Sequence, residues 1–283
     1  MSVQDLTRLY DDLGRFQWWR RRLAGDAGTE GLGMHKQLSD GGVGLSDLNA
    51  WLWERLGDPE PRRVLDLGAG FGATLFEWAE RLPDARFTGL SLSPYQVARA
   101  RAVAAKRGLD QRVEFVETDN ARFDPGASKF DLAVSIETLF HSTDLQATIR
   151  RVAGWLNPGG RFVLVEDMLR EPPTADDAPA RDLSRLWATP TLHTVDEFRA
   201  ALAAANLELI EEHDLSGHVT HGEPDALSRK KSKLGRWARR CPVRSVREVL
   251  RAFQGGIALE ELYAHGSMTY RAWIARRTEE PSR

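Results

Sequence analysis

The chain has 283 residues, which suffices for one sizeable α/β domain with a covering segment rather than two fully independent domains. Its 39 basic and 41 acidic residues leave a formal charge of -2, which excludes a general electrostatic attraction to nucleic acid. A single cysteine, Cys241, excludes an intramolecular disulfide framework, and no apolar run approaches the roughly 18 residues of a membrane span. Residues 1–10 lack the apolar segment of a signal peptide, so a cytoplasmic location is expected.

The elements expected first along the chain are helical. One helix extends to about Leu23, a Gly-rich loop covers 25–44, and a second helix runs from its N-cap Ser46 to Leu56. We therefore expect residues 1–60 to form an N-terminal helical cap.

Strand and helix patterns then alternate. The strand patterns cover 63–67, 86–90, 113–117, 132–136 and 161–166, and the helical patterns cover 73–82, 94–107 and 145–156. This alternation predicts an α/β fold with a doubly wound, mostly parallel sheet and helices on both faces. Ligands bind such sheets beyond the carboxyl ends of the strands.

The last third of the chain changes character. A loop is expected over 171–179, an amphipathic helix over 195–205, a strand over 207–213 and a final strand over 267–274. The expected division is a core over 61–215, a helical lid over 216–262, and a last core strand with its tail over 263–283.

The most specific signal is Asp66-Leu67-Gly68-Ala69-Gly70-Phe71-Gly72, which follows an apolar strand and precedes a helix. Glycines allow a tight turn and a close approach of a ligand, and the helix N-terminus offers unpaired N–H groups. The pattern predicts a nucleotide-cofactor loop.

Two cofactor classes use such a loop. A dinucleotide site expects an acidic residue about 20 positions further on, at the end of the next strand, where this chain has Ser91. The acid is instead Asp66, before the first glycine, where a carboxylate suits an amino group and a sulfonium. We therefore favour S-adenosylmethionine over a dinucleotide.

Further motifs follow in order: Ser91-Leu92-Ser93-x-x-Gln96, Asp119-Asn120, Ser135-Ile136-Glu137 and Leu156-Asn157-Pro158-Gly159-Gly160. With the glycine loop, they resemble class I S-adenosylmethionine-dependent methyltransferases over about residues 60–215. Within that family the chain looks like the tocopherol, sterol and prenyl-diphosphate C-methyltransferases and the cyclopropane fatty acid synthases. The resemblance implies a seven-stranded Rossmann-like sheet whose last strand is antiparallel.

The resemblance also implies which residues bind the cofactor. Ser91, Leu92 and Gln96 would line the ribose, Asp119 and Asn120 the adenine edge, and Tyr10 would close over the cofactor. The full expected set is Tyr10, Asp66, Gly68, Gly70, Ser91, Leu92, Gln96, Asp119, Asn120 and Ser135.

Glu137 and His141 are the expected catalytic residues. Glu137 follows an apolar strand at the end that faces the cofactor, and the C-methyltransferases named above carry Glu there, often as E-x-x-x-H. In that chemistry a carboxylate stabilises a carbocation and removes a proton. A carboxylate that only holds the cofactor and a structural histidine remain open alternatives, and Asp144 is expected to cap a helix.

Acceptor contacts are expected from Glu166, Trp187, Arg239 and Arg240. The two arginines belong to 229–251, which holds ten basic residues and the single acid Glu248. This segment is either a solvated helix face or a lid that binds an anionic acceptor, because guanidinium groups match phosphate geometry.

These patterns predict a methyltransferase that acts on a small molecule, and C-methylation of an alkene-bearing, isoprenoid-like acceptor is the leading hypothesis. O- or N-methylation and a regulatory protein without turnover are the alternatives. His213, His218 and His221 lack the partners of a metal site, so Mg2+ is expected only with a diphosphate acceptor. No nucleic-acid partner is expected, and a homo-oligomer is left open.

Overall fold

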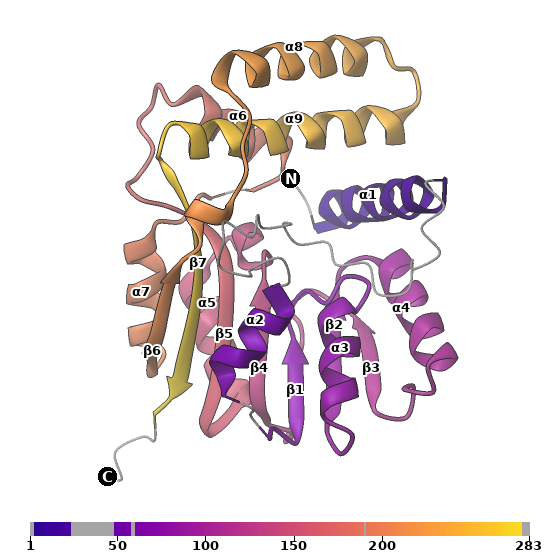
Figure 1. Cartoon of the computed structure of the whole chain (residues 1–283), viewed down its shortest axis with the longest axis vertical. Coiled ribbons are helices and arrows are strands. Elements are labelled where there is room, and N and C mark those ends of the chain that lie inside the picture. The colour runs from indigo at the N-terminus through magenta and orange to yellow at the C-terminus, as the bar shows by residue number, and fades with distance from the viewer. Residues whose placement is uncertain (1–2, 24–47, 58–59, 190, 279–283) are drawn as a thin grey trace.

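The protein is built around a seven-stranded sheet (Figure 1). The computed structural model describes residues 3–23, 48–57, 60–189 and 191–278. The strands are β1 (Arg63–Asp66), β2 (Arg86–Ser91), β3 (Val113–Glu117), β4 (Phe130–Ile136), β5 (Leu156–Leu169), β6 (Leu207–Asp214) and β7 (Met268–Arg277). Their order is β3-β2-β1-β4-β5-β7-β6, and β7 runs antiparallel to both of its neighbours. The expected fold class is therefore confirmed.

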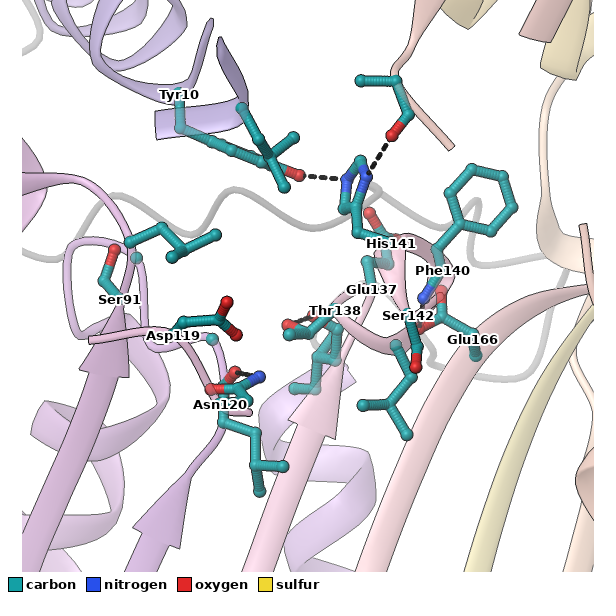
Figure 2. A pocket seen from close by; sticks show the side chains of 18 of the residues that line it. Tyr10, Ser91, Asp119, Asn120, Glu137, Thr138, Phe140, His141, Ser142 and Glu166 are labelled. Atoms are coloured by element: carbon teal, nitrogen blue, oxygen red, sulfur yellow. Dashed lines mark hydrogen bonds between the residues drawn. The ribbon is translucent and has the colours of Figure 1, made fainter. Parts of the chain in front are cut away.

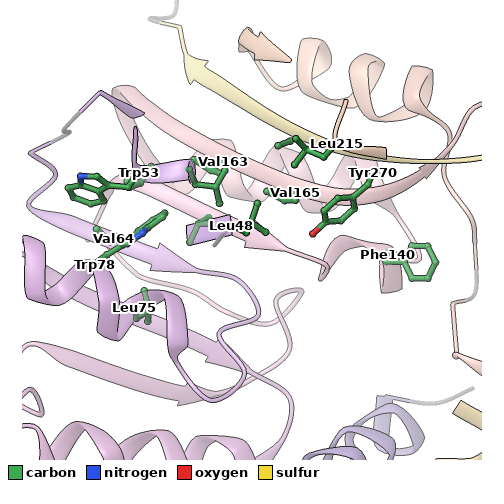
Figure 3. Packing of buried hydrophobic residues seen from close by; sticks show 14 of the residues in the cluster. Leu48, Trp53, Val64, Leu75, Trp78, Phe140, Val163, Val165, Leu215 and Tyr270 are labelled. Carbon is green, nitrogen blue, oxygen red and sulfur yellow. The ribbon is translucent and has the colours of Figure 1, made fainter. Parts of the chain in front are cut away.

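Helices cover both faces of the sheet, because side chains alternate along each strand. Val64 packs with α2 (Leu48–Leu56), α3 (Ala73–Arg81) and α4 (Pro94–Lys106), whereas the next residue, Leu65, packs with α5 (Leu145–Trp155) and α7 (Val195–Ala204) on the opposite face. Figure 3 shows part of the first cluster, in which the rings of Trp53 and Trp78 lie 5.8 Å apart.

Helix starts follow local capping rules. The Asp144 side chain accepts a hydrogen bond from the Ala147 N–H, so Asp144 caps α5 as expected. Thr194 and Glu197 form a reciprocal capping box at α7. Gly72 precedes α3 with φ 87°, and a Cβ there would lie 2.5 Å from the Phe115 ring, so a glycine is required on both counts.

The two N-terminal helices occupy different places. Helix α2 is part of the core, where Leu52 is fully buried, whereas α1 (Val3–Leu23) packs against α4 and α9 (Arg244–Ala264). Helix α1 lies beyond the carboxyl ends of β1 and β2 (Figure 1). The expected loop 25–44 and the N-cap Ser46 lie outside the described residues.

Helices α6 (Ala178–Leu186), α8 (Pro224–Arg240) and α9 form a layer at the same end of the sheet (Figure 1). The short helices η1 (Leu139–His141) and η2 (Ser216–His218) lie in connections. Helix α6 was not expected, although Asp177 and Pro179 at its start are a standard helix-initiation signal. Strand β5 continues to Leu169, which makes Glu166 and Asp167 strand residues paired with β7.

Candidate active site

A cavity of about 840 Å³ lies at the carboxyl edge of the sheet. The carboxyl ends of β1, β2, β4 and β5 and the loops that follow β1, β2, β3 and β4 form one side, and helices α1, α6 and α9 form the other. The volume lies within the usual range for a site that encloses small molecules. Its position is the one predicted for ligand binding in a doubly wound sheet.

The glycine loop after β1 approaches the loop after β4 very closely. A Cβ on Gly68 would lie 1.9 Å from the Thr138 hydroxyl oxygen, so only glycine fits this position without movement. Gly70 has φ 55°, a backbone conformation that residues other than glycine rarely adopt. Both glycines line the cavity, where their main chain is open to a ligand.

Asp66 is the buried charge of this loop. It is 5% exposed, and its carboxylate accepts a hydrogen bond from the Gly68 N–H at 3.3 Å. Burial raises the pKa of Asp66 to about 7, and that hydrogen bond lowers it only in part. No cationic side chain of the described residues pairs with Asp66. A cationic ligand would supply the missing charge, which fits the amino group or the sulfonium of S-adenosylmethionine.

The expected ribose and adenine residues also line the cavity, and Figure 2 shows Ser91, Asp119 and Asn120 among them. Hydrogen bonds hold these three in place. The Ser91 hydroxyl donates to Gln96 Oε1 at 2.9 Å, and the Asn120 amide donates to the Leu67 carbonyl at 2.8 Å. Asp119 accepts from the Ala121 N–H, and the cavity lining also includes Leu92.

Three of the expected site residues do not line the cavity. Ser135 is fully buried inside the sheet, one residue before the end of β4, and the cavity lining begins at Ile136. Arg239 and Arg240 are exposed on α8. Helix α8 packs on α9, and α9 supplies the cavity wall, so the two arginines lie on the outer layer (Figure 1). Neither arginine therefore reaches the cavity, where we expected the two to contact the acceptor.

His141 is held by hydrogen bonds to both ring nitrogens (Figure 2). Its Nδ1 lies 3.2 Å from the carbonyl of Ala188, which can only accept, so Nδ1 carries the proton. Nε2 therefore accepts the hydrogen bond from the Tyr10 hydroxyl at 2.5 Å. Burial lowers the pKa of His141 to about 4, so the ring is neutral at pH 7.

Glu137 lies directly after β4, with φ 51°. The Tyr270 hydroxyl on β7 donates a hydrogen bond to Glu137 Oε1 at 2.9 Å. The Glu137 main-chain N–H donates to the Val165 carbonyl at 2.8 Å, which fixes the residue at the cavity wall. A left-handed conformation at a residue other than glycine is characteristic of functional sites.

Two more carboxylates face the same space. Glu166 is fully buried and accepts hydrogen bonds from the main-chain N–H groups of Phe140 and Asp167. Asp167 accepts a short hydrogen bond from the Tyr263 hydroxyl of α9. The roles of Tyr263, Tyr270 and Ala188 were not foreseen, because their partners lie far away in the sequence. No local pattern identifies such contacts.

The end of the cavity under the helices is largely apolar. Trp187 at the end of α6, one of the residues expected to contact the acceptor, lines it together with Leu6, Leu13, Phe253 and Leu259. The cavity thus has a polar end at the strands and an apolar end beneath α1 and α9, with the three carboxylates and His141 also in its wall.

Comparisons with known proteins agree with this arrangement. A family model described as a methyltransferase domain matches residues 64–160. The chain is 31% identical over 190 residues to the 27-O-demethylrifamycin SV methyltransferase of Amycolatopsis mediterranei, a match that covers 65% of this chain and 70% of that protein. It is 29% identical over 170 residues to the sterol 24-C-methyltransferase ERG6B of Gibberella zeae, covering 59% of this chain. The chain spans 44% of the length of that sterol enzyme and 63% of the methyltransferase GfsG of Streptomyces halstedii.

Among solved structures, the 4+2-cyclase SpnF superposes with a TM-score of 0.73 at 22% identity, over 99% of this chain and 97% of that chain. The geranyl diphosphate C-methyltransferase of Streptomyces coelicolor A3(2), solved with Mg2+, gives 0.61 at 18% identity, over 82% of this chain and 78% of that chain. At these identities the likeness shows the fold alone.

Neither a metal centre nor a membrane span is present in the part of the chain that the structure describes. No three potential ligand side chains there are grouped to hold a metal ion, and no helix is both long and apolar enough to cross a bilayer. The glycine loop, the sheet order and the sequence matches lead to one assignment. The chain belongs to the class I S-adenosylmethionine-dependent methyltransferases.

Proposed function

We propose that this methyltransferase methylates a carbon atom of a small, largely apolar acceptor that carries an alkene, such as an isoprenoid. When bound, S-adenosylmethionine supplies an electrophilic methyl group on its sulfonium. The residues of the glycine loop would hold the cofactor, with the Asp66 carboxylate facing its positive charge. The apolar end under α1 and α9 would receive the acceptor.

The observation that carries the proposal is the presence of three acidic side chains, Glu137, Glu166 and Asp167, in the cavity wall. After burial, the charges of Glu137 and Glu166 raise the pKa of Tyr10, and those two together with Asp167 raise the pKa values of Tyr263 and Tyr270. A site that raises the pKa of hydroxyl groups disfavours forming an alkoxide or phenolate. The same acidic side chains favour a positive charge that develops on a carbon acceptor.

Glu137 is the carboxylate that we assign to this cation. The Tyr270 hydroxyl, itself fully buried, orients Oε1. The left-handed backbone brings the side chain to the cavity wall. In the proposed reaction the carboxylate stabilises the cation formed as the alkene attacks the methyl group, and it accepts the proton whose loss restores a double bond.

O-methylation is the second candidate, and one observation favours it. The neutral His141 ring presents Nε2 as an acceptor, and in this structure Nε2 accepts from the hydroxyl of Tyr10. An acceptor hydroxyl in the place of the tyrosine would be positioned for proton removal as its oxygen is methylated. The tautomer needed for this role is fixed by Ala188.

Two substitutions separate these candidates. For carbon methylation we expect Glu137→Gln to lower turnover by about 100-fold or more, the usual scale for a general base or an electrostatic group, with unchanged cofactor affinity. His141→Gln should then cost much less. For O-methylation the two effects should be reversed. The assay follows S-adenosylhomocysteine release on parallel panels of alkenes and alcohols, with cofactor affinity measured by calorimetry.

The matched control is Glu117→Gln, which removes an exposed carboxylate at the end of β3 that does not line the cavity. It should leave turnover unchanged. If Glu137→Gln retains turnover within about threefold on the best acceptor, less than 1 kcal/mol of transition-state stabilisation is lost and the carbon mechanism is wrong. Cofactor binding without release of S-adenosylhomocysteine on any acceptor would instead favour a regulatory protein.

A further inference from the structure

Helix α8 presents a strongly basic outer face. Six of its cations are exposed, and so is Arg244 at the start of α9; we call this set the basic surface: Arg229, Lys230, Lys233, Arg236, Arg239, Arg240 and Arg244. Within the described residues none of the seven forms an ion pair. By contrast, Lys231 points inward and bridges Asp182 and Glu261 at 2.7 Å each. The inward cation is neutralised. Among the outward ones only Arg244 interacts electrostatically with a described carboxylate, that of Asp12, and the two do not form an ion pair.

Apolar side chains are exposed beside these charges. Trp237 is 51% exposed, with the Lys233 ammonium 4.8 Å from its ring centroid, and Val243 and Val246 are about half exposed. On a helix, positions 229, 233, 236, 237 and 240 share one face, because they lie three or four residues apart. The opposite face packs on α9 through Leu227, Gly235 and Ala238.

Helix α1 extends the same end of the molecule. Leu13 packs with Val249 and Ala252, and the ring of Phe16 lies 5.4 Å from that of Phe253. Figure 1 shows that α1 and α9 run in opposite directions. The end of α1 therefore lies toward the α8–α9 turn (Figure 1). Here Trp19 is 57% exposed, and Arg20 is exposed beside it.

We infer that this end of the protein docks on an anionic lipid bilayer, with the basic surface against lipid phosphates and carboxylates and Trp237 at the level of the headgroups. Tryptophan prefers the membrane–water interface, and cations near an anionic bilayer add to the attraction without a fixed geometric match. Docking of this kind uses a helix that lies on the surface, so it requires no membrane-spanning segment.

The charge pattern favours a bilayer over an acidic protein. Six cations of α8 without an ion pair, and Arg244 beside them, are spread over a helix face and a turn with apolar side chains between them. Such a spread suits a fluid bilayer of anionic lipids. Helices α1 and α9 also wall the cavity, through residues that include Gln17 and Phe253. If the proposed function holds, an apolar acceptor dissolved in the bilayer would have a short path to the site, but the docking itself does not depend on that function.

The test is co-sedimentation of the full chain with phosphatidylcholine vesicles, with and without about a third phosphatidylserine. We expect binding to the anionic vesicles only, and weaker binding as salt is raised. The double variant Arg236→Gln with Arg240→Gln should lower the partition coefficient by roughly 20- to 30-fold, about fivefold for each cation. Trp237→Ala should lower it as well, because the interfacial indole is lost.

The control removes two exposed arginines elsewhere, Arg122→Gln with Arg150→Gln, and should bind like the unaltered chain. Cofactor affinity by calorimetry and circular dichroism would show that each variant is folded. Equal binding to neutral and anionic vesicles, no binding at low salt, or equal losses in the two double variants would overturn the inference. Binding of poly-glutamate without binding of anionic vesicles would assign the surface to an acidic protein instead.

Discussion

Cofactor binding should release a proton from Asp66. Burial shifts its pKa from 3.8 to about 7, and at about 1.4 kcal/mol per unit this disfavours the ionised form by roughly 4 kcal/mol. A bound cation removes that cost, so the ionised form is the one that binds. Below pH 7 we therefore expect the affinity for S-adenosylmethionine to fall about tenfold for each pH unit, whereas above pH 7 it should become independent of pH.

The same shift affects the stability of the protein without cofactor. The folded-state pKa of Asp66 lies above its value of 3.8 in the unfolded chain, so the folded state binds the proton more tightly. The contribution of Asp66 to the free energy of unfolding is most favourable below about pH 4. This contribution is lost progressively as the pH rises to about 7. Asp66→Asn should abolish this dependence, because the amide carries no charge at any of these pH values.

Calorimetry in two buffers with different heats of ionisation counts the protons directly. At pH 6 we expect close to one proton released for each cofactor bound, and at pH 8 almost none. Asp66→Asn should release none at either pH. The matched variant Asp119→Asn, at another carboxylate of the cavity, should keep the release. If the unaltered protein releases no proton at pH 6, or if Asp66→Asn releases as many, the argument from burial is refuted.

Two further predictions concern stability and are checked by urea unfolding. Gly255→Ala places a Cβ 2.9 Å from the main-chain nitrogen of Trp187, so it should lower the free energy of unfolding by about 1–2 kcal/mol. Gly154→Ala, whose Cβ would have no atom within 4 Å, should raise it by up to about 1 kcal/mol. Equal urea midpoints for the two variants would contradict this. Lys231→Met should lower the free energy of unfolding by about 2 kcal/mol, because it leaves the largely buried Glu261 carboxylate without its ion pair and Asp182 with Arg185 alone. Lys233→Met, at an exposed position, should change it by less than about 0.5 kcal/mol, and a larger loss there would show that burial is not what matters.

Much of the sheet and of the cofactor end of the cavity could be predicted from the sequence, because their signals are local. Gly68 and Gly70 follow a strand and precede a helix within a few residues, and Asp144 caps α5 by contacting its third neighbour. Parallel strands then bring their carboxyl ends to one edge, which places Ser91, Asp119 and Glu137 at a single cavity.

The rest depends on contacts that no local pattern encodes. Tyr270 and Glu137 are 133 residues apart, and Tyr263 and Asp167 are 96 apart. The basic segment could be recognised, but whether Arg239 faced the cavity depended on which side of α9 its helix would pack. The packing side is determined by small buried residues of α8, including Gly235 and Ala238, which allow α8 and α9 to approach each other closely.

The cavity draws its two ends from different parts of the chain. The matched methyltransferase domain covers residues 64–160, which hold the glycine loop, whereas α1, α6 and α9 lie outside it. In the proposed function, changes at apolar positions of these helices, such as Leu13 and Phe253, would alter the space for an acceptor and leave the glycine loop intact, whereas Tyr10 of α1 belongs with the cofactor and His141. We therefore expect substitutions in the glycine loop to abolish methyl transfer to any acceptor. Substitutions at the apolar positions of the helices should instead change which acceptor is methylated.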